Sequence, residues 1–199
     1  VWQWDIAQIQ TQPSTGNVIE LLANRIRHLP DTMQDALKRA ACLGGRFDPN
    51  TLACASDATV RDIAAILREA AIQGLLEAIG NAPLSLVADT PQPNDETAAE
   101  FKFAHDRIQQ AAYSLIPDRE KPATHWQMGQ RLLQHVPAEQ REERIFTIVN
   151  QLNAGVALVN TPAERWQVAE LNLLAGKKAK TAAAWGSAFD YLKAGIGLL

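Results

Sequence analysis

The pattern of apolar and polar positions changes its period within residues 101–117, FKFAHDRIQQAAYSLIP. Two phenylalanines flank Lys102, and this alternation predicts a half-buried strand at 101–103. From Asp106 onward, apolar residues recur at spacings of three and four, which predicts a helix that Pro117 ends. The stretch therefore predicts a junction at which a small sheet ends and a helix begins.

Upstream of this junction, apolar stripes at helical spacing alternate with turn signals. Gly44 and Gly45 offer a left-handed exit from one helix, and Asp48 before Pro49 is typical of the capped start of the next. An apolar run at 75–79 predicts a strand that pairs with 101–103. The predicted helices are 17–28, 31–43, 49–55 and 57–72. Before them, residues 1–9 predict a strand or packed arm with Trp2 and Trp4 on one side, and residues 12–16 predict a turn.

Helices followed by a hairpin are the plan of a winged helix. The polar, proline-bearing residues 81–100 would then be an enlarged wing, which has room for a brief strand at 84–87. The alternative is a plain helical bundle with a disordered insert. We favour the winged helix because the two strand patterns flank the proline-bearing loop.

After Pro117 every segment has helical period. The predicted helices are 119–136, 139–159, 161–179 and 182–199. Thr161 and Glu164 flank a proline as a capping box, so this helix start is the best defined in the chain. Small and aromatic residues alternate in the last helix, as in tetratricopeptide repeats. We predict a mainly α fold, with a winged-helix-like domain at 1–104 and a tetratricopeptide-like segment at 105–199. The last helix would then be the first half of a hairpin whose partner lies beyond the chain.

Composition adds few constraints. The 199 residues are 47% apolar and carry a formal charge of −3, which suits a globular protein without overall attraction to nucleic acid or anionic lipid. Cys42 and Cys54 have no second Cys or His at ligand spacing, so we expect reduced thiols. No apolar run is long enough to cross a bilayer, and we expect a cytoplasmic protein. The start at Val1, in mid-pattern, suggests an excised piece of a longer protein.

The sequence contains no catalytic motif. No glycine-rich loop ends in Lys-Ser or Lys-Thr, so a P-loop nucleotide site is excluded, and the four scattered histidines predict no metal site. His105-Asp106 could be an acid/base pair; we favour a structural role, in which the carboxylate caps a helix and the imidazole bonds to local backbone. Lys177, Lys178 and Lys180 are interpreted as a solvated helix end, with a phosphate or partner site as the alternative.

DNA binding is disfavoured by charge. The recognition helix, 57–72, would offer only Arg61 and Arg68, which nearby acidic residues offset. The wing, 80–100, has no Lys or Arg and four acidic residues, which would repel phosphate. A winged helix with this charge pattern is better explained as a protein-contact module.

Several stretches resemble a known family. They are residues 29–44 with 47–48, then 101–117, then EERIFTIVNQLNAG at 142–155 and AELNLLAGKKAK at 169–180. They are similar to very large bacterial signalling proteins that combine a serine/threonine-kinase-like domain, a STAND-type AAA ATPase region, helical repeats, a GAF domain and a C-terminal histidine kinase. The resemblance spans nearly the whole chain in the same order, and 101–117 is its most specific part.

The resemblance implies a position directly after the nucleotide-binding core, in a parent that binds ATP and Mg²⁺, while the chain itself holds no cofactor. It implies a non-catalytic segment that couples the ATPase core to the repeats. Its partners would be neighbouring domains of the same protein and other signalling proteins. It would bind neither nucleic acid nor a membrane. His105, Asp106 and Arg107 are the candidates for interdomain contact. The alternatives are a DNA-binding effector piece of a transcription regulator and a small helical enzyme.

Overall fold

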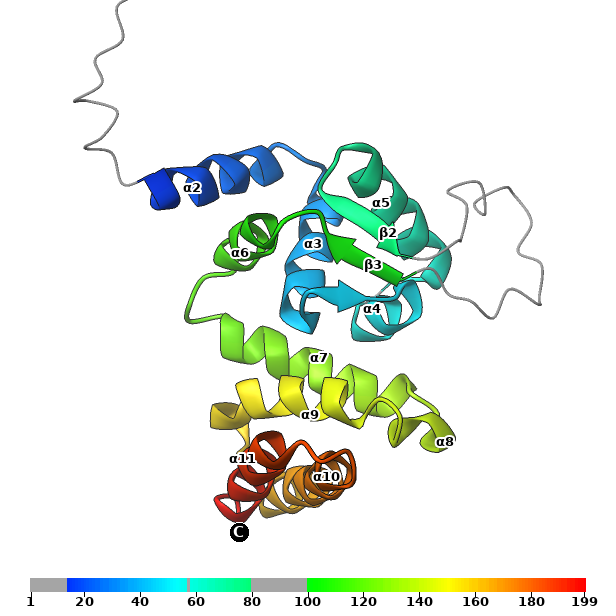
Figure 1. Cartoon of the computed structure of the whole chain (residues 1–199), viewed down its shortest axis with the longest axis vertical. Coiled ribbons are helices and arrows are strands. Elements are labelled where there is room, and N and C mark those ends of the chain that lie inside the picture. The colour runs from blue at the N-terminus through cyan, green and yellow to red at the C-terminus, as the bar shows by residue number, and fades with distance from the viewer. Residues whose placement is uncertain (1–13, 57, 80–99) are drawn as a thin grey trace, which may run out of the picture. The chain divides into compact units, whose positions relative to one another are not determined.

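The computed structural model describes residues 14–56, 58–79 and 100–199. Within these ranges the chain forms ten α-helices and one small antiparallel sheet of three strands, which confirms the predicted mainly α fold (Figure 1). The predictions for the two-tryptophan segment at 1–9, the wing and its brief strand lie outside the described residues. None of the described helices is both long enough and apolar enough to span a membrane.

Two compact units make up the chain. The first combines residues 1–49 with 61–116, and the second combines 50–60 with 117–199. The domain boundary at residues 104 and 105 stays a prediction. The first unit holds helices α2 (Ser14–Arg27), α3 (Asp31–Leu43), α5 (Val60–Ile72) and α6 (Asp106–Ser114) and strands β1 (Arg46–Phe47), β2 (Leu76–Ile79) and β3 (Glu100–Phe103).

Strand β3 lies in the middle of the sheet, between β1 and β2 (Figure 1). The predicted hairpin is confirmed, since Leu76 of β2 lies opposite Phe103 of β3 in antiparallel register. Strand β1, in which Phe47 lies opposite Phe101, was not predicted because two residues are too few to show an alternation. With α4 (Pro49–Ala55) between β1 and α5, the chain order is helix, strand, helix, helix, strand, strand, as in a winged helix.

The apolar side of this sheet and helix α6 share the core of the first unit. Phe47, Phe101 and Phe103 are buried, and the rings of Phe47 and Phe103 lie 5.7 Å apart in a tilted pair. Helix α6 buries Ala111 and Ala112 and packs on both α2 and α3. The helix that follows the hairpin is therefore held on more than one side, which makes it a rigid element of the unit.

Helix α3 ends at Gly44, as the sequence predicts, but the predicted left-handed helical exit is wrong. Gly44 has φ 126° and ψ −162°, an extended conformation with positive φ that is open almost only to glycine. Its amide still closes the helix by donating to the carbonyl of Ala40 at 3.2 Å. The extended exit leads the chain directly into β1, which explains why the helix gives way to a strand within two residues.

The second unit is helical. Besides α4, its elements are α7 (Lys121–His135), α8 (Ala138–Arg141), α9 (Ile145–Ala154), the 3₁₀ turn η1 (Val156–Leu158), α10 (Pro162–Thr181) and α11 (Trp185–Ile196). Helices α7 and α9 form one hairpin with η1, and α10 and α11 form another. The prediction that the last helix is the first half of a hairpin is wrong, because α11 packs back on α10 as its second half (Figure 1).

The single helix predicted over 139–159 is also wrong, since the chain forms α8, α9 and η1 in its place. Lys178 of α10 donates to the carbonyls of Glu142 and Glu143, so these oxygens are satisfied by a side chain instead of by helix amides. At the other end, Gly155 adopts φ −99° and ψ 8° and closes α9 against α7. Both breaks arise from contacts between helices.

The capping box at the start of α10 is confirmed. The Thr161 hydroxyl accepts from the Glu164 amide at 3.2 Å, and the Glu164 carboxylate accepts from the Thr161 amide at 3.1 Å. The hydroxyl also donates to this carboxylate, and the two hydrogen bonds from Thr161 lower the pKa of Glu164 below its ordinary 4.5.

Replacing Thr161 with valine is expected to raise the pKa of Glu164 toward 4.5, because the hydroxyl hydrogen bond to the carboxylate is lost. A carboxylate with a lowered pKa stabilises the folded state above its unfolded pKa and loses this contribution as the pH falls through the folded value. NMR titration of the Glu164 carboxyl carbon in both proteins measures the change. An unchanged pKa in Thr161→Val would show that the hydroxyl is not the cause.

Candidate functional site

His105 and Asp106 lie where β3 ends and α6 begins. His105 Nδ1 accepts a hydrogen bond from the Arg107 amide at 3.0 Å, so the imidazole is the cap of α6. The prediction that the Asp106 carboxylate caps this helix is therefore wrong. Asp106 is the first helical residue instead, where its negative charge suits the positive end of the helix dipole. Because an amide can only donate, Nδ1 carries no proton in this arrangement.

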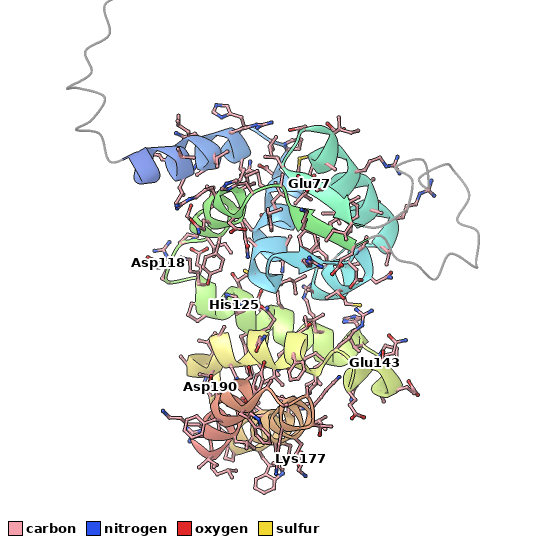
Figure 2. The ribbon with its side chains drawn as sticks, in the orientation of Figure 1. Glu77, Asp118, His125, Glu143, Lys177 and Asp190 are labelled. Carbon is pink, nitrogen blue, oxygen red and sulfur yellow. The ribbon has the colours of Figure 1, made fainter. Side chains whose placement is uncertain are left out.

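A pocket of about 400 Å³ opens beside this junction, within the first unit. Its polar side chains come from β1, β3, α6 and the turn between β3 and α6, which strand pairing and helix packing bring together. Arg46 of β1 lies opposite Lys102 of β3 in the sheet register. Lys102 Nζ also pairs at 2.8 Å with Glu77 of β2, which is labelled in Figure 2. The polar lining is Arg46, Lys102, His105, Asp106 and Gln109.

The pocket is suited to polar contact with a polypeptide. It presents the cations Arg46 and Lys102, the carboxylate of Asp106 and the exposed imidazole of His105. Such a mixture of donors and acceptors can match a polar loop of another domain. In the parts of the chain that the structure describes, no three His, Cys, Asp or Glu side chains group closely enough to hold a metal ion.

The structure separates the three predicted contact residues. His105 and Asp106 line the pocket, while the Arg107 guanidinium turns along the helix and donates to Gln110 at 3.0 Å. Sequence reasoning missed Arg46 and Lys102 as members of this site. Arg46 lies in the short segment between two predicted helices, and this position is the signal that could have found it. In the fold this segment pairs with β3.

A second polar contact lies inside the second unit. His125 of α7 is buried, and its Nδ1 lies 2.7 Å from the Gln151 side-chain oxygen of α9 (Figure 2). Since a carbonyl oxygen only accepts, Nδ1 is the donor. The hydrogen bond fixes the two helices of one hairpin relative to each other.

Comparison with known proteins finds a similarity of the whole chain to a signalling protein. No described protein family matches the chain, and no solved structure matches it. The chain is similar to part of a histidine kinase. It aligns over its whole length with "Hybrid signal transduction histidine kinase G" of Dictyostelium discoideum, at 26% identity over 234 residues. The chain spans only 7% of that protein.

The similarity agrees with the resemblance in its coarse form, a distant relation to a segment of a hybrid signal transduction histidine kinase. The relative comes from an amoeba, so the similarity extends beyond the bacterial proteins of the resemblance. At 7% of the relative, the chain covers one small segment of a long protein, and the relative's name describes that whole protein.

Proposed function

We propose that this chain is a non-catalytic coupling segment of a multidomain sensor kinase. The observation that carries the proposal is the alignment of the entire chain with a small part of a hybrid signal transduction histidine kinase. The lack of a P-loop in the sequence supports a role without nucleotide chemistry of its own. In this proposal the catalytic steps belong to other domains of the parent protein, which would bind ATP and Mg²⁺.

The pocket at His105 and Asp106 is the proposed contact with an upstream ATPase core of the STAND type. A domain that binds there acts directly on the first turn of α6, because His105 caps that helix. Helix α6 packs on α2 and α3, so it transmits a displacement as one body. Residues 115–120 connect α6 to α7 covalently, and through them the displacement would reach the repeats.

Reversing the charge at the pocket tests the proposal in the full-length parent protein. Asp106→Lys is expected to reduce the effect of nucleotide in the ATPase core on kinase output by about fivefold or more, the lower end of typical allosteric couplings. Kinase autophosphorylation with ATP or ADP bound at the core measures this effect. Nucleotide affinity of the core is measured in parallel and is expected to stay unchanged.

Glu139→Lys is the matched control, because it makes the same charge change at an exposed site on α8 of the second unit. If both variants keep the full nucleotide effect, the pocket is not the contact. If the isolated chain binds ATP, the proposal that it lacks a nucleotide site is wrong.

A transcription effector is the second candidate, because the element order is that of a winged helix. It requires duplex DNA affinity that falls steeply with salt. On α5, Arg61 and Arg68 alternate with the acidic Asp62 and Glu69, which leaves little net charge to meet phosphate. A DNA titration at two salt concentrations separates the two functions, since the coupling segment is expected to bind at neither.

A further inference from the structure

The two helical hairpins of the second unit are copies of one packing unit. In the first, Gly129 of α7 allows Leu152 of α9 to approach; in the second, Gly176 of α10 does the same for Leu192 of α11. A Cβ on either glycine would lie within 2.8 Å of the leucine side chain. A second contact between the helices repeats in the same register. Three residues after each leucine, Gly155 lies against Pro122 and Gly195 lies against Ala169. Helix α11 therefore corresponds to α9, position by position.

This correspondence pairs an apolar stripe on α9 with one on α11. Ile145 and Val149 correspond to Trp185 and Phe189. Ile145 and Val149 are 0% exposed, whereas Trp185 and Phe189 are each 65% exposed. The stripe continues through Ile196 and Leu199, which are 72% and 78% exposed.

The α9 stripe is covered by α10. Ile145 and Val149 form one cluster with Ala175 of α10, and Leu171 and Leu174 of the same helix pack against it. The small side chain of Ala175 allows α9 and α10 to lie close together, with Leu171 and Leu174 beside it. Nothing among the described residues covers α11 in the same way, although its stripe carries larger side chains than α9.

We infer that the stripe of Trp185, Phe189 and Ile196 binds an amphipathic protein helix of the same kind as α10. This inference rests on the repeat geometry and is independent of the proposed function. The groove beside the stripe, about 290 Å³ in volume, extends the surface onto α10 through Trp166 and Leu173. Because Trp185 and Phe189 are bulkier than Ile145 and Val149, the bound helix presents alanine or glycine at its centre.

Charge specifies the bound helix further. Across the α9–α10 contact, the side-chain amides of Asn153 and Asn172 exchange two hydrogen bonds of 2.9 Å. The position on α11 that corresponds to Asn153 is the exposed Lys193. A helix that docks as α10 does would place its equivalent of Asn172 opposite this ammonium group. The partner helix is therefore expected to carry Asp or Glu at that position, because a carboxylate makes a stronger, charge-assisted hydrogen bond to the ammonium group than an amide oxygen does.

A synthetic peptide with the sequence of α10, residues 162–181, is the probe. It carries Asn172→Asp to meet Lys193 and Trp166→Phe to remove its own indole. Isothermal titration of the whole chain is expected to show binding, and Trp185→Ala with Phe189→Ala to weaken it by about tenfold or more, the effect of losing aromatic anchors. Both side chains are mostly exposed, so the double variant is expected to fold; circular dichroism confirms this.

Ile72→Ala is the matched control, since Ile72 of α5 is as exposed as the two aromatics but belongs to the first unit. A charge exchange gives the second test: Lys193→Glu is expected to weaken binding of the peptide with Asn172→Asp and to restore binding of a peptide with Asn172→Lys. The inference is overturned if no peptide binds. It is also overturned if the double variant binds the peptide equally well, because the peptide would then be replacing the chain's own α10 instead of binding to the stripe. Self-association of the chain through Trp185 and Phe189 would also overturn it and assign this surface to a second copy.

Discussion

Replacing Phe103 with alanine is expected to lower the unfolding free energy of the first unit by about 3–5 kcal/mol, the cost of truncating a buried aromatic residue. Phe103 is buried on the central strand, opposite Leu76, and its ring packs against Phe47 at 5.7 Å. The substitution removes the contact that joins all three strands on their apolar side. Native-state hydrogen exchange of the β2 and β3 amides measures the loss in this unit alone.

Lys102→Ala is the control on the same strand. Lys102 points to the other side of the sheet, is 43% exposed at its side chain and pairs with the exposed Glu77. Exposed ion pairs contribute between zero and about 1 kcal/mol, so this variant is expected to be nearly as stable as the parent. Equal losses for the two variants would contradict the alternation of buried and exposed positions on β3.

Gly155→Ala is expected to destabilise the second unit by about 1–3 kcal/mol, the usual cost of overpacking a core. An added Cβ would lie 2.6 Å from the Cβ of Trp126 and 2.7 Å from the carbonyl oxygen of Pro122. A backbone oxygen cannot rotate away as a side chain can, so α7 and α9 must separate. Urea unfolding followed by tryptophan fluorescence measures the change, because Trp126 lies at the contact.

Gly186→Ala is the matched control with the opposite expected sign. Gly186 lies in helix α11 with no atom within 4 Å of an added Cβ, and alanine favours helix by up to about 1 kcal/mol over glycine. The variant is therefore expected to be as stable as the parent or slightly more stable. If Gly155→Ala were as stable as Gly186→Ala, the close approach of α7 and α9 would be disproved.

The elements that the sequence predicted best are those whose signals are local. Helix 31–43 and helix 49–55 form over the predicted ranges, and the capping box at Thr161 forms with both of its hydrogen bonds. The strands of the hairpin follow from apolar runs on each side of one polar loop. In all these cases, residues close in the chain decide the conformation, through hydrogen-bond geometry and the period of apolar positions.

The candidate site was predictable only in part. His105 and Asp106 attract notice in the sequence because they stand at the change of period, and both line the pocket. Arg46 reaches the same pocket through pairing of β1 with β3, across more than fifty residues of chain. The local pattern also could not predict which of the two side chains caps α6. Both are suited to that position, and only the backbone geometry distinguishes them.

By itself the sequence determined the helical character of the chain, the hairpin, the capped start of α10 and the absence of a P-loop. Only the tertiary structure decided that α8, α9 and η1 are separate, that α11 closes a hairpin with α10, and that Trp185 and Phe189 remain exposed where Ile145 and Val149 are buried. The physical reason is that helix period fixes which side of a helix is apolar, whereas the partner of that side depends on contacts between distant segments, such as a glycine that admits a leucine or a lysine that takes two carbonyls.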